Sequence, residues 1–204
     1  MFSAKTYAAR RNMLRTKIGS GIVLFPGNPL SPNNYPNNAY YFRQDSSFLY
    51  YFGLNVPSLA GLIDADTGEE ALYGDDFTVE DIIWTGPQPT LRELGAKVGI
   101  AATYPLSELE KRLRKAISLG RKIHFLPPYR GETKLWLSSL LGIKPALLHD
   151  YKSVDLMFAV AEMREKKSAE EIEEMERAFQ IGYKMHTLAT VSYTHLRAHE
   201  TSAH

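Results

Sequence analysis

The sequence predicts an α/β protein in which helices flank a mixed β-sheet, followed by a C-terminal linker helix. Short apolar runs bounded by glycine and proline recur along the chain, and amphipathic segments of helical period lie between them. The turn at 65–68 joins two of these runs and predicts a hairpin, hence some antiparallel pairing. The chain has 204 residues, 44% of them hydrophobic, which is enough for a domain with its own core.

The first expected helix begins after Ser3, which can cap it, and runs to about Lys17. The residues expected to face inward on it are Tyr7, Met13, Leu14 and Ile18. Glycines end this helix, and the Ile-Val-Leu-Phe run at 22–25 is the first expected strand. The loop at 28–39, with three prolines and five asparagines, is too rich in turn residues for regular structure.

The middle of the chain contains the expected hairpin and three short helices. After an extended stretch at 39–43, Ser46 is expected to cap a helical turn that ends near Tyr51. The hairpin strands are expected at 59–64 and 70–74. The next expected elements are helices at 79–84 and 91–97 and a short strand at 98–100.

The last third of the sequence is predicted to be mostly helical. The expected elements are helices at 107–119, 133–141 and 154–164 and a strand at 123–126. A capping box of Ser168 and Glu171 then begins a long helix. The apolar residues that can share one face of it are Ile172, Met175, Phe179, Met185 and Leu188.

This layout predicts three parts: an α/β domain at 1–165, a linker with the first helix of a following domain at 166–190, and a tail at 191–204. The apolar period stops near Val191, and SYTHLRAHET resembles translated read-through of a sequencing adapter. We therefore expect a non-native, disordered tail. His195 and His199 have the i,i+4 spacing of a metal clip on a helix, but an unstructured end is the favoured interpretation.

Composition excludes several classes of function. A net charge of +1 gives no electrostatic basis for binding nucleic acid or anionic lipid, and no apolar run approaches the ~18 residues of a membrane span. The chain has no cysteine, which excludes disulfides and thiol nucleophiles. A reducing cytoplasm is the expected setting.

The Asp, Glu, Ser and His residues of this chain, which are catalytic in many enzymes, do not form a catalytic motif here. The Asp-x-Asp-x-Gly pattern at 64–68 fits a β-turn better than a calcium loop, and the acidic pairs at 75–76 and 80–81 fit a loop and a first helical turn. His124 lies in an apolar strand and His149 in a loop, so a Ser-His-Asp triad is not indicated. No catalytic residue and no metal ligand is predicted in this chain.

The segment FRQDSSFLYYFGLNVP, residues 42–57 and hereafter the hallmark segment, sets polar residues among aromatic ones. Together with the following LAGLID, it resembles the N-terminal domain of aminopeptidase P, the Xaa-Pro aminopeptidases. The stretch from Met163 to His186 is similar to the junction that opens the catalytic domain in that family. Residues 81–84, Asp-Ile-Ile-Trp, are similar to the segment that brings a tryptophan toward the substrate.

The resemblance covers residues 1–190 and implies an N-terminal domain of the creatinase and prolidase type, followed by a catalytic pita-bread domain. That domain holds two manganese ions on two Asp, one His and two Glu, and removes the residue before proline from short peptides. These ligands are expected beyond Thr190, so this chain is expected to bind no metal and to be inactive alone.

The resemblance also implies what the N-terminal part does in a full-length, homo-oligomeric enzyme: it shapes the substrate cleft and the subunit contacts. Arg43, Tyr51 and Trp84 are the candidate substrate-binding residues. Two alternatives stay open, namely a non-catalytic binding or assembly module of the same fold, and a prolidase- or creatinase-like relative with another substrate.

Overall fold

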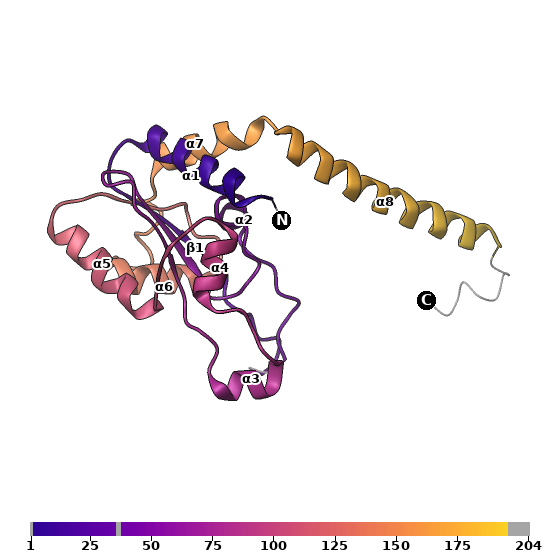
Figure 1. Ribbon diagram of the computed structural model, residues 1–204, viewed down its shortest axis with the longest axis horizontal. Coiled ribbons are helices and arrows are strands. Elements are labelled where there is room, and N and C mark those ends of the chain that lie inside the picture. The colour runs from indigo at the N-terminus through magenta and orange to yellow at the C-terminus, as the bar shows by residue number, and fades with distance from the viewer. Residues whose placement is uncertain (1, 36–37, 196–204) are drawn as a thin grey trace. The chain divides into compact units, whose positions relative to one another are not determined.

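The computed structural model describes residues 2–35 and 38–195, and the chain divides into two compact units, Met1–Met163 and Arg164–His204 (Figure 1). The helices are α1 (Ala4–Ile18), α2 (Ser46–Phe52), α3 (Val79–Thr85), α4 (Leu91–Lys97), α5 (Leu106–Ser118), α6 (Gly131–Leu141), α7 (Val154–Glu165) and α8 (Ala169–His195). The strands are β1 (Ile22–Pro26), β2 (Ala60–Asp64), β3 (Glu70–Tyr73), β4 (Ala102–Tyr104) and β5 (Ile123–His124).

A mixed five-stranded sheet lies in the first unit, with the strand order β4-β3-β2-β1-β5. β2 pairs antiparallel with both β1 and β3, which confirms the predicted hairpin. β5 runs parallel to β1, and β4 runs parallel to β3. The predicted fold class, a mixed sheet flanked by helices, is therefore confirmed.

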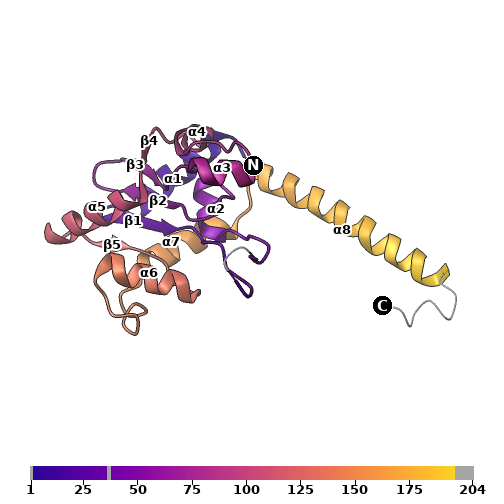
Figure 2. The same ribbon diagram turned by 90° about the horizontal axis from the view of Figure 1, so that it is seen from below.

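The two faces of the sheet bury two separate apolar clusters, because side chains along a strand alternate between faces. On β1, Val23 and Phe25 join the cluster formed with α1, α2, α4 and α7. Ile22 and Leu24 join the other cluster, formed with α5 and α6. Figure 1 shows α5 and α6 on one side of the strands and α2 and α4 on the other, and Figure 2 gives a second view of the strands.

The strand expected at 98–100 is wrong: the fourth strand is β4, four residues later. The backbone N–H groups of Val98 and Ile100 both donate to the carbonyl of Gly95, at 3.1 and 2.9 Å. These bonds close the end of α4, and they take up the donors that a sheet ladder would have required. The chain can pair with β3 only after this turn is complete.

The first helix confirms its predicted start, since the Ser3 hydroxyl accepts a hydrogen bond from the Thr6 backbone N–H. Tyr7 and Leu14 are buried as expected, but Met13 is 53% exposed, so its inward assignment is wrong. Arg11 is fully buried on the inward face. At i+4 from Tyr7 and i−3 from Leu14 it continues their stripe, whereas Met13 points away.

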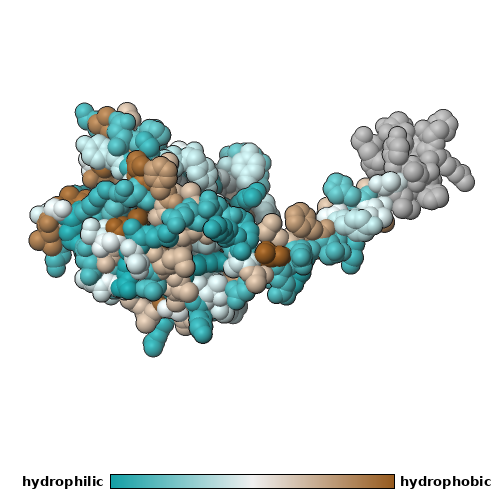
Figure 3. Space-filling model, turned by 90° about the horizontal axis from the view of Figure 1, so that it is seen from above, coloured by the Kyte–Doolittle hydropathy of each residue, from teal (hydrophilic) through white to brown (hydrophobic). Residues whose placement is uncertain are grey.

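In the second unit, α8 begins as predicted. The Ser168 N–H donates to Glu171, and the Glu171 N–H donates back to the Ser168 hydroxyl. Hydrophobic side chains lie among hydrophilic ones along this helix (Figure 3). The helix continues to His195. The assignment of residues 191–204 as a non-native tail stays a prediction. Residues 196–204, with His199, lie outside the described part.

Within residues 2–35 and 38–195, no helix combines the length and the apolar character that crossing a bilayer requires.

Candidate functional site

Gln44 holds the hallmark segment together from inside the protein. Its side-chain oxygen accepts hydrogen bonds from the backbone N–H groups of Asn28 and Asp45, at 2.6 and 2.9 Å. Its side-chain nitrogen donates to the carbonyl of Val56 at 2.7 Å. This buried amide satisfies three backbone groups, and it ties the start of the loop, at Asn28, to both ends of the hallmark segment.

Asp45, and not Ser46 as predicted, caps α2. Its carboxylate accepts hydrogen bonds from the N–H groups of Ser47 and Phe48, both at 2.9 Å. A carboxylate at this position also interacts favourably with the helix dipole. The acidic residue of the hallmark segment therefore fixes local backbone.

The aromatic residues of α2 form core. Phe48 and Phe52 stack at 5.1 Å between ring centroids, and the ring of Tyr51 lies 4.7 Å from that of Phe25. Tyr51 is fully buried, and its hydroxyl donates to the sulfur of Met163 at 3.5 Å. In this unit Tyr51 therefore packs in the core, and its predicted role toward a substrate stays a prediction.

Gly53 ends α2 in the left-handed conformation, with φ of 65°. A Cβ at this position would lie 2.2 Å from the ring of Tyr7. Both the backbone angle and the space therefore require glycine here. The hallmark glycine brings α1 and α2 into close contact.

Arg11 is a buried, charged residue whose role was not predicted from the sequence. Its guanidinium donates to the Glu70 carboxylate at 2.7 Å and to the carbonyls of Tyr51 and Val98, both at 3.0 Å. Burial lowers the pKa of Arg11, and the Glu70 charge works against this shift. The only signal for it in the sequence was its position between Tyr7 and Leu14 on the inward stripe.

Arg43 and Trp84 lie on the surface of the first unit. Arg43 is exposed, and its backbone carbonyl accepts a hydrogen bond from the Asn28 side chain at 2.9 Å. Trp84 lies in α3 and is 82% exposed. The two residues come from separate surface segments, and their role toward a substrate stays a prediction.

Every residue of α3 is exposed, although four of its seven residues are apolar. Val79, Ile83 and Trp84 are each more than 70% exposed. A capping box holds the helix: the Thr78 N–H donates to the Asp81 carboxylate at 2.8 Å, and the Asp81 N–H donates to the Thr78 hydroxyl at 3.2 Å. The bonds from Thr78 lower the pKa of Asp81. The helix is thus locally well formed and exposes apolar side chains on the surface of this unit.

A pocket of about 310 Å³ lies beside α3. It brings together Pro57 from the end of the hallmark segment and Asp81 from α3. Its other two carboxylates have structural roles: Asp75 accepts from the Leu106 N–H at 3.1 Å, and Asp76 accepts from the Leu91 N–H at 2.6 Å. The acidic pair at 75–76 therefore caps the first residues of α5 and α4, in keeping with the loop interpretation.

The Asp-x-Asp-x-Gly segment is a turn held by an arginine. The Gly68 N–H donates to the Asp64 carbonyl at 2.9 Å, and Arg121 donates to the carboxylates of both Asp64 and Asp66. Burial acts to raise the pKa of Asp64, but the bonds from Arg121 and from the turn's backbone outweigh it and lower the pKa. An arginine on these oxygens leaves them unsuited to calcium.

His124 is a core histidine. Its Nε2 lies 3.1 Å from the carbonyl of Ser20, which only accepts, so Nε2 carries the proton and Nδ1 accepts from the Ser153 hydroxyl at 2.6 Å. Burial, together with the charge of Lys122, lowers the pKa of His124. His149 is exposed.

Among the described residues, no group of three or more His, Asp or Glu side chains is arranged to hold a metal ion. The dinuclear manganese site that the resemblance implies therefore does not fit the donor groups of this part of the chain. We assign no metal-dependent step to these residues.

Comparisons with family models, with curated proteins and with solved structures agree on one family. Residues 7–146 match the model of the aminopeptidase P N-terminal domain. An uncharacterized peptidase of Saccharomyces cerevisiae is 27% identical over 188 residues, which cover 92% of this chain and 33% of the yeast protein.

Solved structures of Escherichia coli aminopeptidase P share the fold. The low-pH form has a TM-score of 0.74 and 23% identity, over 92% of this chain and 44% of that chain. A zinc-substituted form in complex with product has the same TM-score and identity, over 91% and 44%. The chain thus spans about a third of the yeast relative and less than half of the bacterial one.

Proposed function

The chain belongs to the aminopeptidase P family through its N-terminal domain, and from this premise we propose that it is the non-catalytic N-terminal part of a metal-dependent Xaa-Pro aminopeptidase. The match over residues 7–146 supports this proposal. The unmatched remainder of each relative leaves room for a separate catalytic domain. In the proposal that domain uses two manganese ions and acts on short peptides with proline second. The lack of cysteine suits a cytoplasmic enzyme.

The proposed task of this part is to form one wall of the peptide cleft. The observation that carries the proposal is α3, a capped helix whose Val79, Ile83 and Trp84 side chains are all exposed. Exposed apolar residues on one small element mark a contact surface, and an indole offers a large face to a proline ring or a peptide. The buried residues of the hallmark segment, among them Phe48 and Phe52, stabilise the fold that positions this helix.

A second proposed task is contact with the catalytic domain and with other subunits. The exposed apolar residues of α8 include Met175, Phe179 and Met185, at 42, 68 and 67%. We expect this stripe to cover itself by self-association when the 204-residue chain is purified alone. Static light scattering at increasing concentration checks this, and a monomer throughout would contradict it.

The direct test of the proposal uses peptidase assays. The purified 204-residue chain is expected to release no residue from a Xaa-Pro peptide in the presence of manganese. The natural coding sequence that follows Thr190 is expected to supply two Asp, one His and two Glu. Robust turnover by the 204-residue chain would overturn the proposal, and an extension without those ligands would favour the assembly module.

The role of α3 is tested in the extended, active protein. Trp84→Ala is expected to lower kcat/KM on a Xaa-Pro peptide about tenfold, since truncating a central aromatic contact costs about 1–2 kcal/mol. Tyr151→Ala removes another exposed aromatic residue, outside α3, and serves as the matched control. Equal losses in both variants would exclude a specific role for Trp84.

A further inference from the structure

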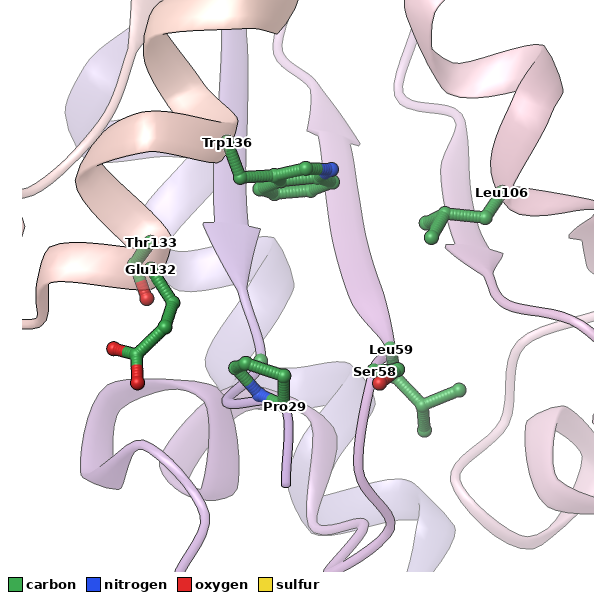
Figure 4. Close-up of a pocket in the computed structure, with 8 residues that line it drawn as sticks. Pro29, Ser58, Leu59, Leu106, Glu132, Thr133 and Trp136 are labelled. Atoms are coloured by element: carbon green, nitrogen blue, oxygen red, sulfur yellow. The ribbon is translucent and has the colours of Figure 1, made fainter. Parts of the chain in front are cut away.

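A second pocket, of about 280 Å³, opens between α5 and α6 over the ends of β1 and β2. Its apolar walls are Pro29, Leu59, Leu106 and Trp136. Figure 4 shows the indole of Trp136 and the ring of Pro29 above and below the opening, with Leu59 and Leu106 on one flank. This volume lies at the small end of ligand pockets and suits one small ring with a short substituent.

The pocket presents a neutral surface to a ligand. Among the lining residues that the structure describes, Glu132 is the one that carries a charge, and this charge has its own partners. The carboxylate accepts a hydrogen bond from the Ser31 hydroxyl at 3.2 Å and lies 3.6 Å from the Arg130 guanidinium. Figure 4 shows it turned away from Leu59 and Leu106. An uncharged ligand group is therefore favoured, because a charge buried here would lack a counter-ion.

The indole N–H of Trp136 is a hydrogen-bond donor that the chain leaves open. Trp136 is half-buried against the apolar cluster on the α5 and α6 side of the sheet. Over residues 2–35 and 38–195, its nitrogen has no protein acceptor. Figure 4 shows this nitrogen at the end of the ring that lies toward Leu106. A ligand that covers the indole therefore needs an acceptor, such as a carbonyl oxygen, to satisfy this donor.

The backbone carbonyls at the floor of the pocket already accept hydrogen bonds. The Gly27 N–H donates to the carbonyl of Leu59 at 2.8 Å, and the Ser58 N–H donates to the carbonyl of Asn28 at 3.0 Å. A Cβ on Gly27 would lie 2.6 Å from the Leu59 carbonyl oxygen, so this close approach requires glycine. A ligand N–H buried against this floor would have to compete for these carbonyls, whereas a group without an N–H has nothing to leave unpaired.

We propose that this pocket binds a proline residue within an extended peptide. The pyrrolidine ring lies between Trp136 and Pro29, and a peptide carbonyl beside it accepts the indole N–H. Proline fits these observations because its ring is small and apolar and its amide nitrogen carries no hydrogen. A prolyl segment is also pre-ordered as polyproline II, and aromatic-lined grooves bind such segments. The pocket lining shares no residue with α3, so this inference goes beyond the proposed function.

Three blocked tripeptides test the proposal, with proline, sarcosine or valine between two alanines. Sarcosine lacks both the ring and the N–H, valine has similar size but keeps the N–H, and the blocked ends remove the free N-terminus that an aminopeptidase needs. The chain has two tryptophans, so Trp84→Phe leaves Trp136 as the sole indole reporter in NMR spectra.

In the Trp84→Phe chain, the proline probe is expected to move the indole N–H resonance of Trp136 downfield and to saturate in the millimolar range. We expect it to bind about three- to tenfold more tightly than the valine probe, the difference that one unpaired polar group can make. The sarcosine probe is expected to lie between the two.

Matched variants separate the hydrogen bond from the shape of the pocket, with affinity measured by saturation-transfer difference NMR, which needs no tryptophan. Trp136→Phe keeps a ring but removes the N–H, and it is expected to weaken the proline probe about three- to tenfold. Trp84→Phe, the same change at the other indole, is expected to keep the affinity. Leu106→Phe fills the pocket and is expected to abolish binding, whereas Leu119→Phe, at a residue 67% exposed just beyond α5, is expected to keep it.

Thermal unfolding of each variant verifies that it is folded, and the titration of the Trp84→Phe chain stands independently of the pocket variants. Absence of a saturable shift with the proline probe at tens of millimolar would overturn the proposal, as would equal affinity for the proline and valine probes. Loss of binding in Trp84→Phe together with its retention in Trp136→Phe would move the proline site to α3 and overturn the proposal as well.

Discussion

Two helices of this protein share a local design and differ in their environment. α2 and α3 each have seven residues, each begins at a side-chain cap, Asp45 or Thr78, and each ends at a glycine with positive φ, Gly53 or Gly86. α2 buries four of its residues between α1 and the sheet, whereas every residue of α3 is exposed.

The difference shows that an aromatic residue on a well-capped helix can either pack in the core or lie on the surface, where it is available for contacts. In α2 the rings of Phe48 and Phe52 stabilise the fold by burial. In α3 the indole of Trp84 is exposed and contributes little to the fold of this chain, and in the proposal above it contacts a peptide. The proposal thus separates a helix that stabilises the fold from a helix that contacts substrate.

The largest expected contrast comes from truncating one aromatic residue in each helix. Phe52→Ala is expected to lower the free energy of unfolding by about 3–5 kcal/mol, because it removes a fully buried ring and leaves a cavity. Trp84→Ala is expected to change it by less than about 0.5 kcal/mol. Urea denaturation followed by circular dichroism measures both, and similar losses would break the contrast.

A comparable loss is expected where α1 supports α2. Arg11→Met leaves Glu70 and the carbonyls of Tyr51 and Val98 without their donor, and it is expected to cost about 3–5 kcal/mol. Arg92→Met, at an exposed position on α4, is the control and should cost less than about 0.5 kcal/mol. If the two variants unfold at the same denaturant concentration, Arg11 does not anchor α2.

The two terminal glycines give a smaller, matched contrast. Gly53→Ala meets both an unfavourable φ and the ring of Tyr7, and about 2–4 kcal/mol is expected to be lost. Gly86→Ala meets open space, and the exposed α3 segment can rearrange locally, so a loss below about 1 kcal/mol is expected. Equal unfolding midpoints of the two variants in guanidinium chloride would show that the space around the added Cβ has no effect on stability.

The smallest effect concerns a third region, the buried contact of β5 with α7. Because the pKa of His124 is lowered in the folded state, the unfolded chain binds a proton first as pH falls through about 6.5. Stability that is fully present above that pH is then lost, by up to about 1.4 kcal/mol per pH unit.

Denaturation at several pH values between 7.5 and 5 checks this effect. His124→Gln is expected to remove the slope, and His149→Gln, at an exposed position, is expected to retain it. A slope that survives in the first variant would assign the pH dependence to another group.

Much of the fold was predictable from the sequence because its signals are local. The caps at Ser3 and Ser168, the turn at 65–68 and the period of α5 each act over a few residues. The prediction of a strand at 98–100 was wrong because a short apolar run is equally typical of the turn that ends a helix and of the start of a strand.

The candidate site was only partly predictable. Trp84 and Arg43 were placed by resemblance, and both are exposed. The sequence did not predict that Tyr51 is buried, since the same aromatic pattern occurs in a core and at the rim of a pocket. The Arg11 anchor depends on partners 40, 59 and 87 positions away along the chain, a separation over which periodicity carries no information.

By itself, the sequence determined the fold class, the family, the hairpin and most helix boundaries, because these depend on backbone propensities and on side chains within about one helical turn. Only the tertiary structure decided which of two similarly capped helices is buried, which arginine lies in the core, and where residues from four distant segments close a pocket beside Trp136. Burial is a property of neighbours that meet only when the chain folds, and for that reason it separates α2 from α3.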